Sequence, residues 1–125
     1  MKKEVVLLVD DDPSIRESVS TILEEEGIEV LIAKNGQACL EVLKKGFHGL
    51  ILMDIQMPGI DGLDTIQNLM DQKLIHGNII CMLTAESSPD ERLNPMKEYV
   101  LDYIQKPFDK ERLVTMVRRY LSYLK

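Results

Sequence analysis

The sequence predicts an α/β fold of the doubly wound class, in which a parallel sheet of five strands carries helices on both faces. Two observations lead to this prediction. Continuous apolar runs of strand length lie at residues 5–9, 50–53 and 79–83, as expected of strands buried on both faces. Segments with helical spacing of apolar residues lie between them, and this alternation is typical of a parallel sheet with helical crossovers.

The first strand and helix are predicted by clear end signals. Residues 5–9 read Val-Val-Leu-Leu-Val, and Asp12 and Pro13 follow as an N-cap and a first helical residue. Gly27 is placed to end the helix. Its predicted apolar stripe consists of Ile15, Val19, Ile22 and Leu23.

The same unit then repeats along the chain. Alternating Ile28, Val30 and Ile32 predict a half-covered strand nearer the sheet edge, and a helix over 36–45 ends at Gly46. Strands are predicted at 50–53, 79–83 and 101–104, and Asp109 caps the last helix. The remaining predicted helical stripes are Leu63, Ile66, Leu69 and Met70, and then Leu113, Met116, Val117, Tyr120, Leu121 and Leu124.

Length and composition limit the classes of protein that the chain can represent. We expect a single domain over residues 1–125, with a hydrophobic fraction of 45% and a net charge of -6. That charge disfavours direct binding to nucleic acid or an anionic membrane, and no apolar run approaches the ~18 residues of a membrane span. The start shows no signal-peptide pattern. Cys39 and Cys81 are predicted to be buried reduced thiols of a cytoplasmic protein, with a disulfide or metal site as the alternative.

Polar side chains follow four of the predicted strands. Asp10, Asp11 and Asp12 follow the first strand, and Asp54 follows the third; Thr84 and Ala85 follow the fourth, and Lys106 follows the fifth. Ligands of open α/β sheets bind beyond the carboxyl ends of the strands. Carboxylates held this close repel one another unless a cation lies between them. The pattern therefore predicts a site for a hard divalent cation, with Mg²⁺ the abundant candidate.

These segments resemble, in order and over essentially the whole chain, the signatures of response regulator receiver domains in two-component signalling. They are Val9-Asp10-Asp11, the stretch 53–62, Thr84-Ala85 and the stretch 103–108. The resemblance implies a flavodoxin-like sheet in the order 2-1-3-4-5, as in the chemotaxis regulators of this family. It also implies that Asp54 accepts a phosphoryl group from a histidine kinase or a phosphotransfer protein.

The resemblance assigns the metal site and the groups around the phosphoryl group. Asp10 and Asp11 would be the acid pair, with Asp11 as the more direct Mg²⁺ ligand beside Asp54 and the carbonyl of Gln56. Lys106, which precedes an expected cis Pro107, would pair with the carboxylate and later with a phosphoryl oxygen. The Thr84 hydroxyl and the backbone N–H near Ala85 would bind the phosphoryl group.

Tyr103 and the segment before it bear on the output of such a switch. Tyr103 matches the family's switch aromatic, and the alternative is an ordinary edge-strand tyrosine with a buried ring. Asn94-Pro95 interrupts the expected fourth helix, so we predict a short, split or displaced helix there. We therefore treat the family's phosphorylation-dependent homodimer, and its downstream protein partner or output domain, as open for this chain.

Two other functions compete with the signalling switch. A Mg²⁺-dependent phosphohydrolase for small molecules would need a second acid two residues after Asp54, where this chain has Gln56. A phosphorylation-independent interaction module would not need the full set of polar residues. The expected activity is therefore that of a phosphoacceptor that catalyses only its own phosphorylation and dephosphorylation.

Overall fold

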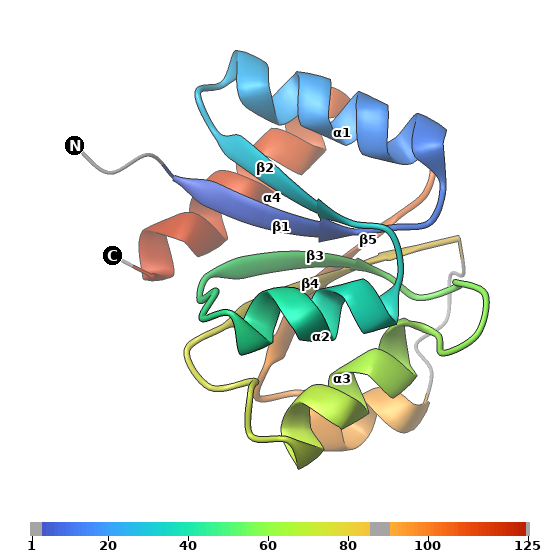
Figure 1. The fold of residues 1–125 in the computed structure, drawn as a ribbon. Coiled ribbons are helices and arrows are strands. Elements are labelled where there is room, and N and C mark those ends of the chain that lie inside the picture. Colours follow the sequence, from blue (N-terminus) through green and yellow to red (C-terminus); the bar gives the residue numbers. More distant parts are fainter. Residues whose placement is uncertain (1–3, 86–90, 125) are drawn as a thin grey trace.

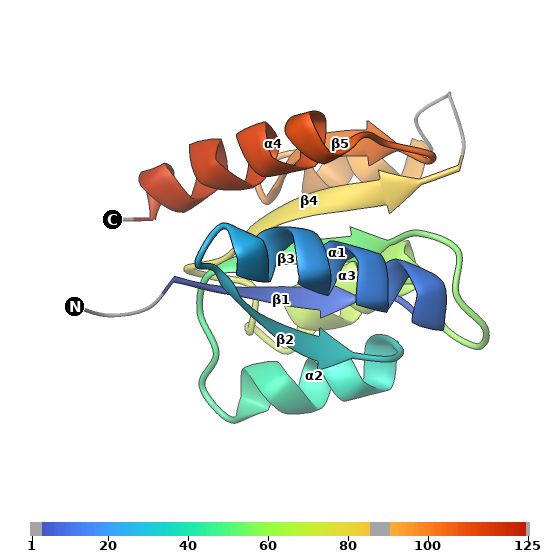
Figure 2. The same ribbon diagram turned by 90° about the horizontal axis from the view of Figure 1, so that it is seen from above.

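The computed structural model describes residues 4–85 and 91–124 as a five-stranded parallel sheet with helices on both faces (Figures 1 and 2). The strands are β1 (Val5–Val9), β2 (Glu29–Ala33), β3 (Leu50–Asp54), β4 (Ile79–Thr84) and β5 (Val100–Gln105). Their order is β2-β1-β3-β4-β5, which confirms the predicted flavodoxin-like topology.

Four α-helices connect or follow the strands: α1 (Pro13–Glu25), α2 (Gly36–Lys44), α3 (Gly62–Asp71) and α4 (Lys110–Tyr123). The predicted caps are confirmed, because the Asp12 side chain accepts a hydrogen bond from Ser14 N and the Asp109 side chain accepts one from Arg112 N. Asp61 and Asp64 form a reciprocal capping box at the start of α3. No helix within the described residues is both long enough and apolar enough to cross a membrane.

Two hydrophobic cores lie on opposite faces of the sheet. Figure 1 shows α1 and α4 on one face and α2 and α3 on the other. Alternate strand residues supply each core, so that Leu7 and Ile51 pack toward α2 and α3 while Val6 and Leu52 pack toward α1 and α4. Cys39 and Cys81 are buried free thiols, as predicted.

Two apolar residues that were predicted to be buried, one on edge strand β2 and one at the end of α4, are exposed. The edge position of β2 is confirmed, but Ile32 is 43% exposed, because β2 has a strand neighbour on one side only. The stripe of α4 is buried as predicted from Leu113 to Leu121, whereas Leu124 caps the helix and is exposed.

The connection between β4 and β5 contains a 3₁₀ helix, η1 (Glu91–Met96), with Pro95 inside it. Among the described residues this 3₁₀ element stands where the fourth α-helix was expected, which agrees with the predicted interruption at Asn94-Pro95. Residues 86–90 of the predicted segment lie outside the described residues. Pro95 cannot donate a backbone hydrogen bond, which disfavours a regular α-helix through this position. Arg92 anchors η1 to the start of α3 through Asp61 and Asp64, at 3.0 and 3.4 Å.

Candidate functional site

The carboxyl ends of the strands lie on one side of the molecule, where the arrowheads of Figure 2 point. Asp10 directly follows β1, Asp54 is the last residue of β3, Thr84 ends β4, and Lys106 follows β5. These four strands are consecutive neighbours in the sheet. The fold therefore brings the predicted site residues to one edge, at the reversal of strand order between β1 and β3, where ligands of doubly wound sheets bind.

Three carboxylates form the centre of the site. Asp10, Asp11 and Asp54 each offer an oxygen atom, and these three oxygens lie within 4.8 Å of one another. Asp10 is completely buried and Asp54 is 5% exposed. Oxygen donors at this spacing suit a hard cation such as Mg²⁺, which usually binds one or two carboxylates and keeps some of its waters. The donor set thus fits the predicted metal.

Lys106 joins two of these carboxylates. Its Nζ lies 3.1 Å from Asp10 Oδ2 and 3.3 Å from Asp54 Oδ1. Burial favours the neutral amine, but the hydrogen bonds and negative charges of Asp10 and Asp54 outweigh it and raise the pKa of Lys106. The lysine therefore remains a cation. The cis peptide between Lys106 and Pro107 is present as expected.

Asp54 is the acid most affected by this environment. Burial, followed by the negative charge of Asp10, raises the pKa of Asp54 to about 6, although Lys106 and the backbone N–H of Gln56 favour the ionised form. The Gln56 N–H lies 3.3 Å from Asp54 Oδ1. Without a cation beside it, Asp54 would be ionised at neutral pH at a cost in free energy.

Asp11, Asp54 and Lys106 border an open cavity of about 400 Å³. Its lining residues are Asp11, Asp12, Pro13, Asp54, Gln56, Ala85 and Lys106. Gln56 and Ala85 thus lie at the cavity, as the family motif predicts. A small, highly charged group can reach Asp54 from solvent through this opening.

The predicted switch residues occupy different environments. Thr84 is buried, and its carbonyl oxygen accepts a hydrogen bond from Lys106 N. Tyr103 is 44% exposed, so the alternative of a buried ring is wrong. It borders a second cavity of about 310 Å³ between η1 and β5, whose lining includes none of Asp10, Asp11 and Asp54. Thr84 pairs with Gln105 in the sheet register, and Tyr103 pairs with Met82.

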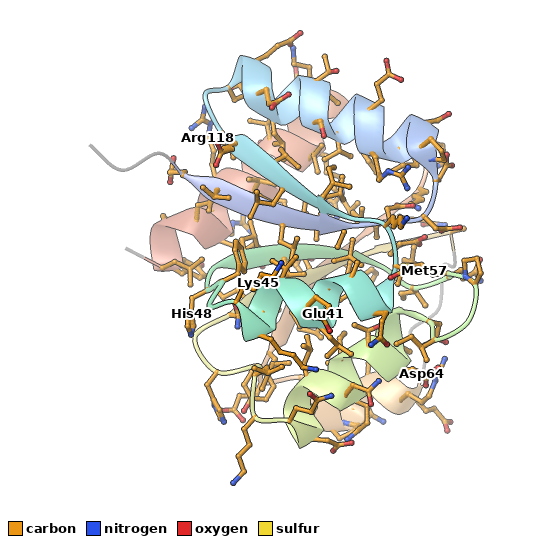
Figure 3. All side chains as sticks on the ribbon, viewed as in Figure 1. Glu41, Lys45, His48, Met57, Asp64 and Arg118 are labelled. Carbon is orange, nitrogen blue, oxygen red and sulfur yellow. The ribbon has the colours of Figure 1, made fainter. Side chains whose placement is uncertain are left out.

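The histidines lie away from this site, as expected. His48 lies two residues before the start of β3. Figure 3 places it on the opposite side of the molecule from Met57, which lies in the loop after Asp54. His48 Nδ1 lies 2.9 Å from the carbonyl oxygen of Gly46, and the His76 ring packs edge-on against Tyr99. These contacts fit structural roles.

Two residues that the sequence analysis did not single out contact the site. Arg16 Nη1 donates a hydrogen bond to the carbonyl oxygen of Asp10 at 3.1 Å. Gly62 packs so closely on β3 that a Cβ there would overlap the carbonyl oxygen of Asp54. Gly62 N also donates to the carbonyl oxygen of Ile55 at 2.8 Å. Arg16 lies four residues after the predicted N-cap Asp12, so the sequence could have indicated that its side chain reaches back toward the end of the first strand. Nothing in the sequence indicated the contact of Gly62.

Comparison with known proteins gives a consistent result. The family model described as the response regulator receiver domain matches residues 6–118. A CheY-like receiver domain from Methanospirillum hungatei superposes with a TM-score of 0.91 at 44% identity, covering 98% of each chain. The regulator TrrA from Thermotoga maritima, solved in complex with Mg(2+)-BeF, gives a TM-score of 0.79 at 34% identity, covering 94% of this chain and 99% of TrrA.

Curated relatives are longer than this chain. The transcriptional regulatory protein CpxR of Escherichia coli is 34% identical over 93% of this chain and 48% of its own length. The probable transcriptional regulator ycf27 of Porphyridium aerugineum is 34% identical over 97% of this chain and 49% of its own length. The chain therefore spans about half the length of the curated relatives that it matches.

Proposed function

Because the chain belongs to the response regulator receiver domain family, we propose that Asp54 accepts a phosphoryl group from a histidine kinase or a phosphotransfer protein in a Mg²⁺-dependent reaction. One observation carries the proposal. The carboxylate of Asp54 borders an open cavity, beside two further carboxylates and 3.3 Å from the Lys106 ammonium group.

The proposed transfer requires an ionised, accessible Asp54. A carboxylate oxygen of Asp54 forms a bond to phosphorus as the bond between phosphorus and the histidine nitrogen of the donor breaks, which leaves an acyl phosphate. With a pKa of about 6, Asp54 is mostly ionised at neutral pH without a metal. Lys106 is free to move from Asp54 to a phosphoryl oxygen after transfer, because its second contact to Asp10 keeps it in the site.

The metal would be held by Asp10, Asp11, Asp54 and the carbonyl oxygen of Gln56. When bound, Mg²⁺ would neutralise the carboxylates and the charge that develops on the phosphoryl oxygens. The clustered oxygens support this proposal. The TrrA complex with Mg(2+)-BeF supports it as well, since that protein shares this fold.

The signal would pass from the site through β4 and β5. In this proposal the Thr84 hydroxyl and the backbone N–H near Ala85 bind the phosphoryl group, and Tyr103 changes its position in response. Such a switch shifts a two-state equilibrium. A downstream partner or output domain, or a phosphorylation-dependent homodimer, would read the change in the cytoplasm. The transcriptional roles in the names of CpxR and ycf27 support an output of that kind.

The test is incubation with acetyl phosphate or beryllofluoride in the presence of Mg²⁺. We expect Asp54 to be modified, as detected by intact mass for acetyl phosphate and by amide chemical shifts for beryllofluoride. EDTA and Asp54→Asn should each abolish the response, whereas Asp71→Asn, at an exposed carboxylate at the end of α3, should leave it intact. A response that persists in Asp54→Asn would contradict the proposal.

Two further assays separate the competing functions. A phosphohydrolase would release phosphate from small phosphomonoesters over many turnovers, but the residue two positions after Asp54 is Gln56, which cannot act as a general acid. An interaction module that works without phosphorylation would bind its partner equally well as wild type and as Asp54→Asn.

A further inference from the structure

Asp10 is held at every polar atom. Its N–H donates to the carbonyl oxygen of Ala33 at 3.2 Å, and its Oδ1 accepts from Asp12 N at 2.9 Å. Its Oδ2 accepts from Lys106 Nζ at 3.1 Å, and its carbonyl oxygen accepts from Arg16 Nη1 at 3.1 Å. Since Asp10 is completely buried, water cannot replace a lost partner without entering the core. Arg16 is the partner that reaches Asp10 by a long side chain from helix α1.

The geometry of α1 accounts for this reach. Arg16 lies one turn after the N-cap Asp12, to whose carbonyl oxygen its own N–H donates at 3.0 Å. Side chains in a helix lean toward its N-terminus, so the Arg16 side chain passes back over the first turn toward the end of β1. The arginine thereby spans the connection between β1 and α1 that carries Asp10, Asp11 and Asp12.

The guanidinium of Arg16 makes this contact without an ion pair. Within residues 4–85 and 91–124, no carboxylate lies within 4.0 Å of it. A cation close to a helix N-terminus is also opposed by the helix dipole. Among the described residues, the guanidinium therefore has its polar contact at the carbonyl oxygen of Asp10. This contact ties helix α1 to the end of β1.

We propose that Arg16 is a positioning residue of the metal site, which fixes the main chain at Asp10 so that Asp10 and Asp11 hold their oxygens ready for the cation. This inference rests on the proposed function. The residue acts through the backbone of Asp10 and touches neither the cation nor the phosphoryl group. Partners that orient metal ligands in this way commonly change metal affinity when they are removed.

Electrostatics and positioning predict opposite results for Arg16→Gln. Removal of a positive charge beside three carboxylates should by itself strengthen Mg²⁺ binding. Loss of the contact to Asp10 should loosen the ligands and weaken binding. We expect positioning to dominate, with the dissociation constant for Mg²⁺ raised about tenfold, within the range typical of such partners.

The experiment is a calorimetric titration of the whole domain with Mg²⁺, supported by the amide chemical shifts of Asp11 and Asp12. Arg16→Lys keeps the charge and one donor, so it should recover part of the affinity that Arg16→Gln loses. The matched control is Lys44→Gln, which removes one positive charge from the last turn of α2, at an exposed site, and should leave the affinity unchanged.

The outcomes separate this inference from the proposed function. Equal or tighter Mg²⁺ binding by Arg16→Gln, with wild-type protein still modified at Asp54, would overturn the role of Arg16 and leave the phosphoacceptor function intact. If Arg16→Gln does not fold, Arg16→Met keeps the apolar stem of the side chain without a donor, and wild-type affinity in that variant would overturn the role as well. Failure of wild-type protein to bind Mg²⁺ or to be modified would overturn both.

Discussion

Replacement of Asp54 with asparagine should stabilise the metal-free protein at neutral pH. The pKa of Asp54 is raised from 3.8 to about 6 in the folded chain, through burial and the charge of Asp10. A carboxyl group with a raised folded pKa binds its proton more tightly in the folded state. Its ionisation therefore destabilises the fold progressively as the pH rises from 3.8 to about 6, and the full penalty applies above that range.

The size of the effect follows from the shift. A change of about 2.2 pKa units corresponds to about 3 kcal/mol. The asparagine side chain would carry no charge to bury, so the variant should be more stable by about 2–3 kcal/mol at pH 7.5 in EDTA. At pH 4 the folded wild-type carboxyl is mostly protonated, and the difference should fall below about 1 kcal/mol.

The assay is urea unfolding followed by circular dichroism, at both pH values and in EDTA. With a slope of about 1.5 kcal/mol per molar urea, the midpoint of Asp54→Asn should rise by about 1.3–2 M at pH 7.5. Added Mg²⁺ should stabilise wild type more than the variant and narrow the gap. Asp71→Asn, at an exposed carboxylate, is the matched control. A midpoint equal to or below that of wild type at pH 7.5 would refute the argument from burial.

Three further predictions test contacts around the site and the core. Gly62→Ala should destabilise the fold by about 1–3 kcal/mol and weaken Mg²⁺ binding in a titration, because its Cβ would overlap the Asp54 carbonyl oxygen; unchanged affinity would show that the loop yields without moving Asp54. Asn78→Ala should lower the free energy of unfolding by about 2–4 kcal/mol, since it leaves the N–H of Gly49 without its 2.8 Å partner and removes the donor to three carbonyl oxygens. Thermal unfolding measures this loss, and a loss below about 1 kcal/mol would mean that water replaces the side chain. Amides of η1 should exchange at least about 100-fold faster than those of α4, and protection equal to that of α4 would contradict the short 3₁₀ element.

The regular part of the fold was predictable because periodicity and capping are local properties. The strands β1, β3 and β4 were predicted by continuous apolar runs, and α1 and α4 by Asp12 and Asp109 at their N-caps. The exposure of Ile32 was not predictable from alternation, since it depends on whether another strand covers that edge.

The site was predictable to the level of which residues converge. Parallel strands place their carboxyl ends at one edge, so Asp10, Asp54 and Lys106 had to lie near one another. The details depend on tertiary distances that the sequence does not display. Lys106 contacts Asp10 as well as Asp54. Gly62 is required because a Cβ there would overlap the carbonyl oxygen of Asp54, and a glycine in a turn motif does not indicate such a contact.

The charged site draws its members from strand ends spread over the chain, from Asp10 after β1 to Lys106 after β5, and this has a practical consequence for a divided version of the domain. A break in the loop between α3 and β4 would leave Asp10, Asp11 and Asp54 on one piece and Lys106 on the other. Neither piece alone could offer the complete set of charges. In the proposed mechanism Lys106 and Thr84, both from the second piece, bind the phosphoryl group on Asp54. Recovery of Asp54 modification by acetyl phosphate on mixing two such fragments would thus report reassembly of the whole sheet.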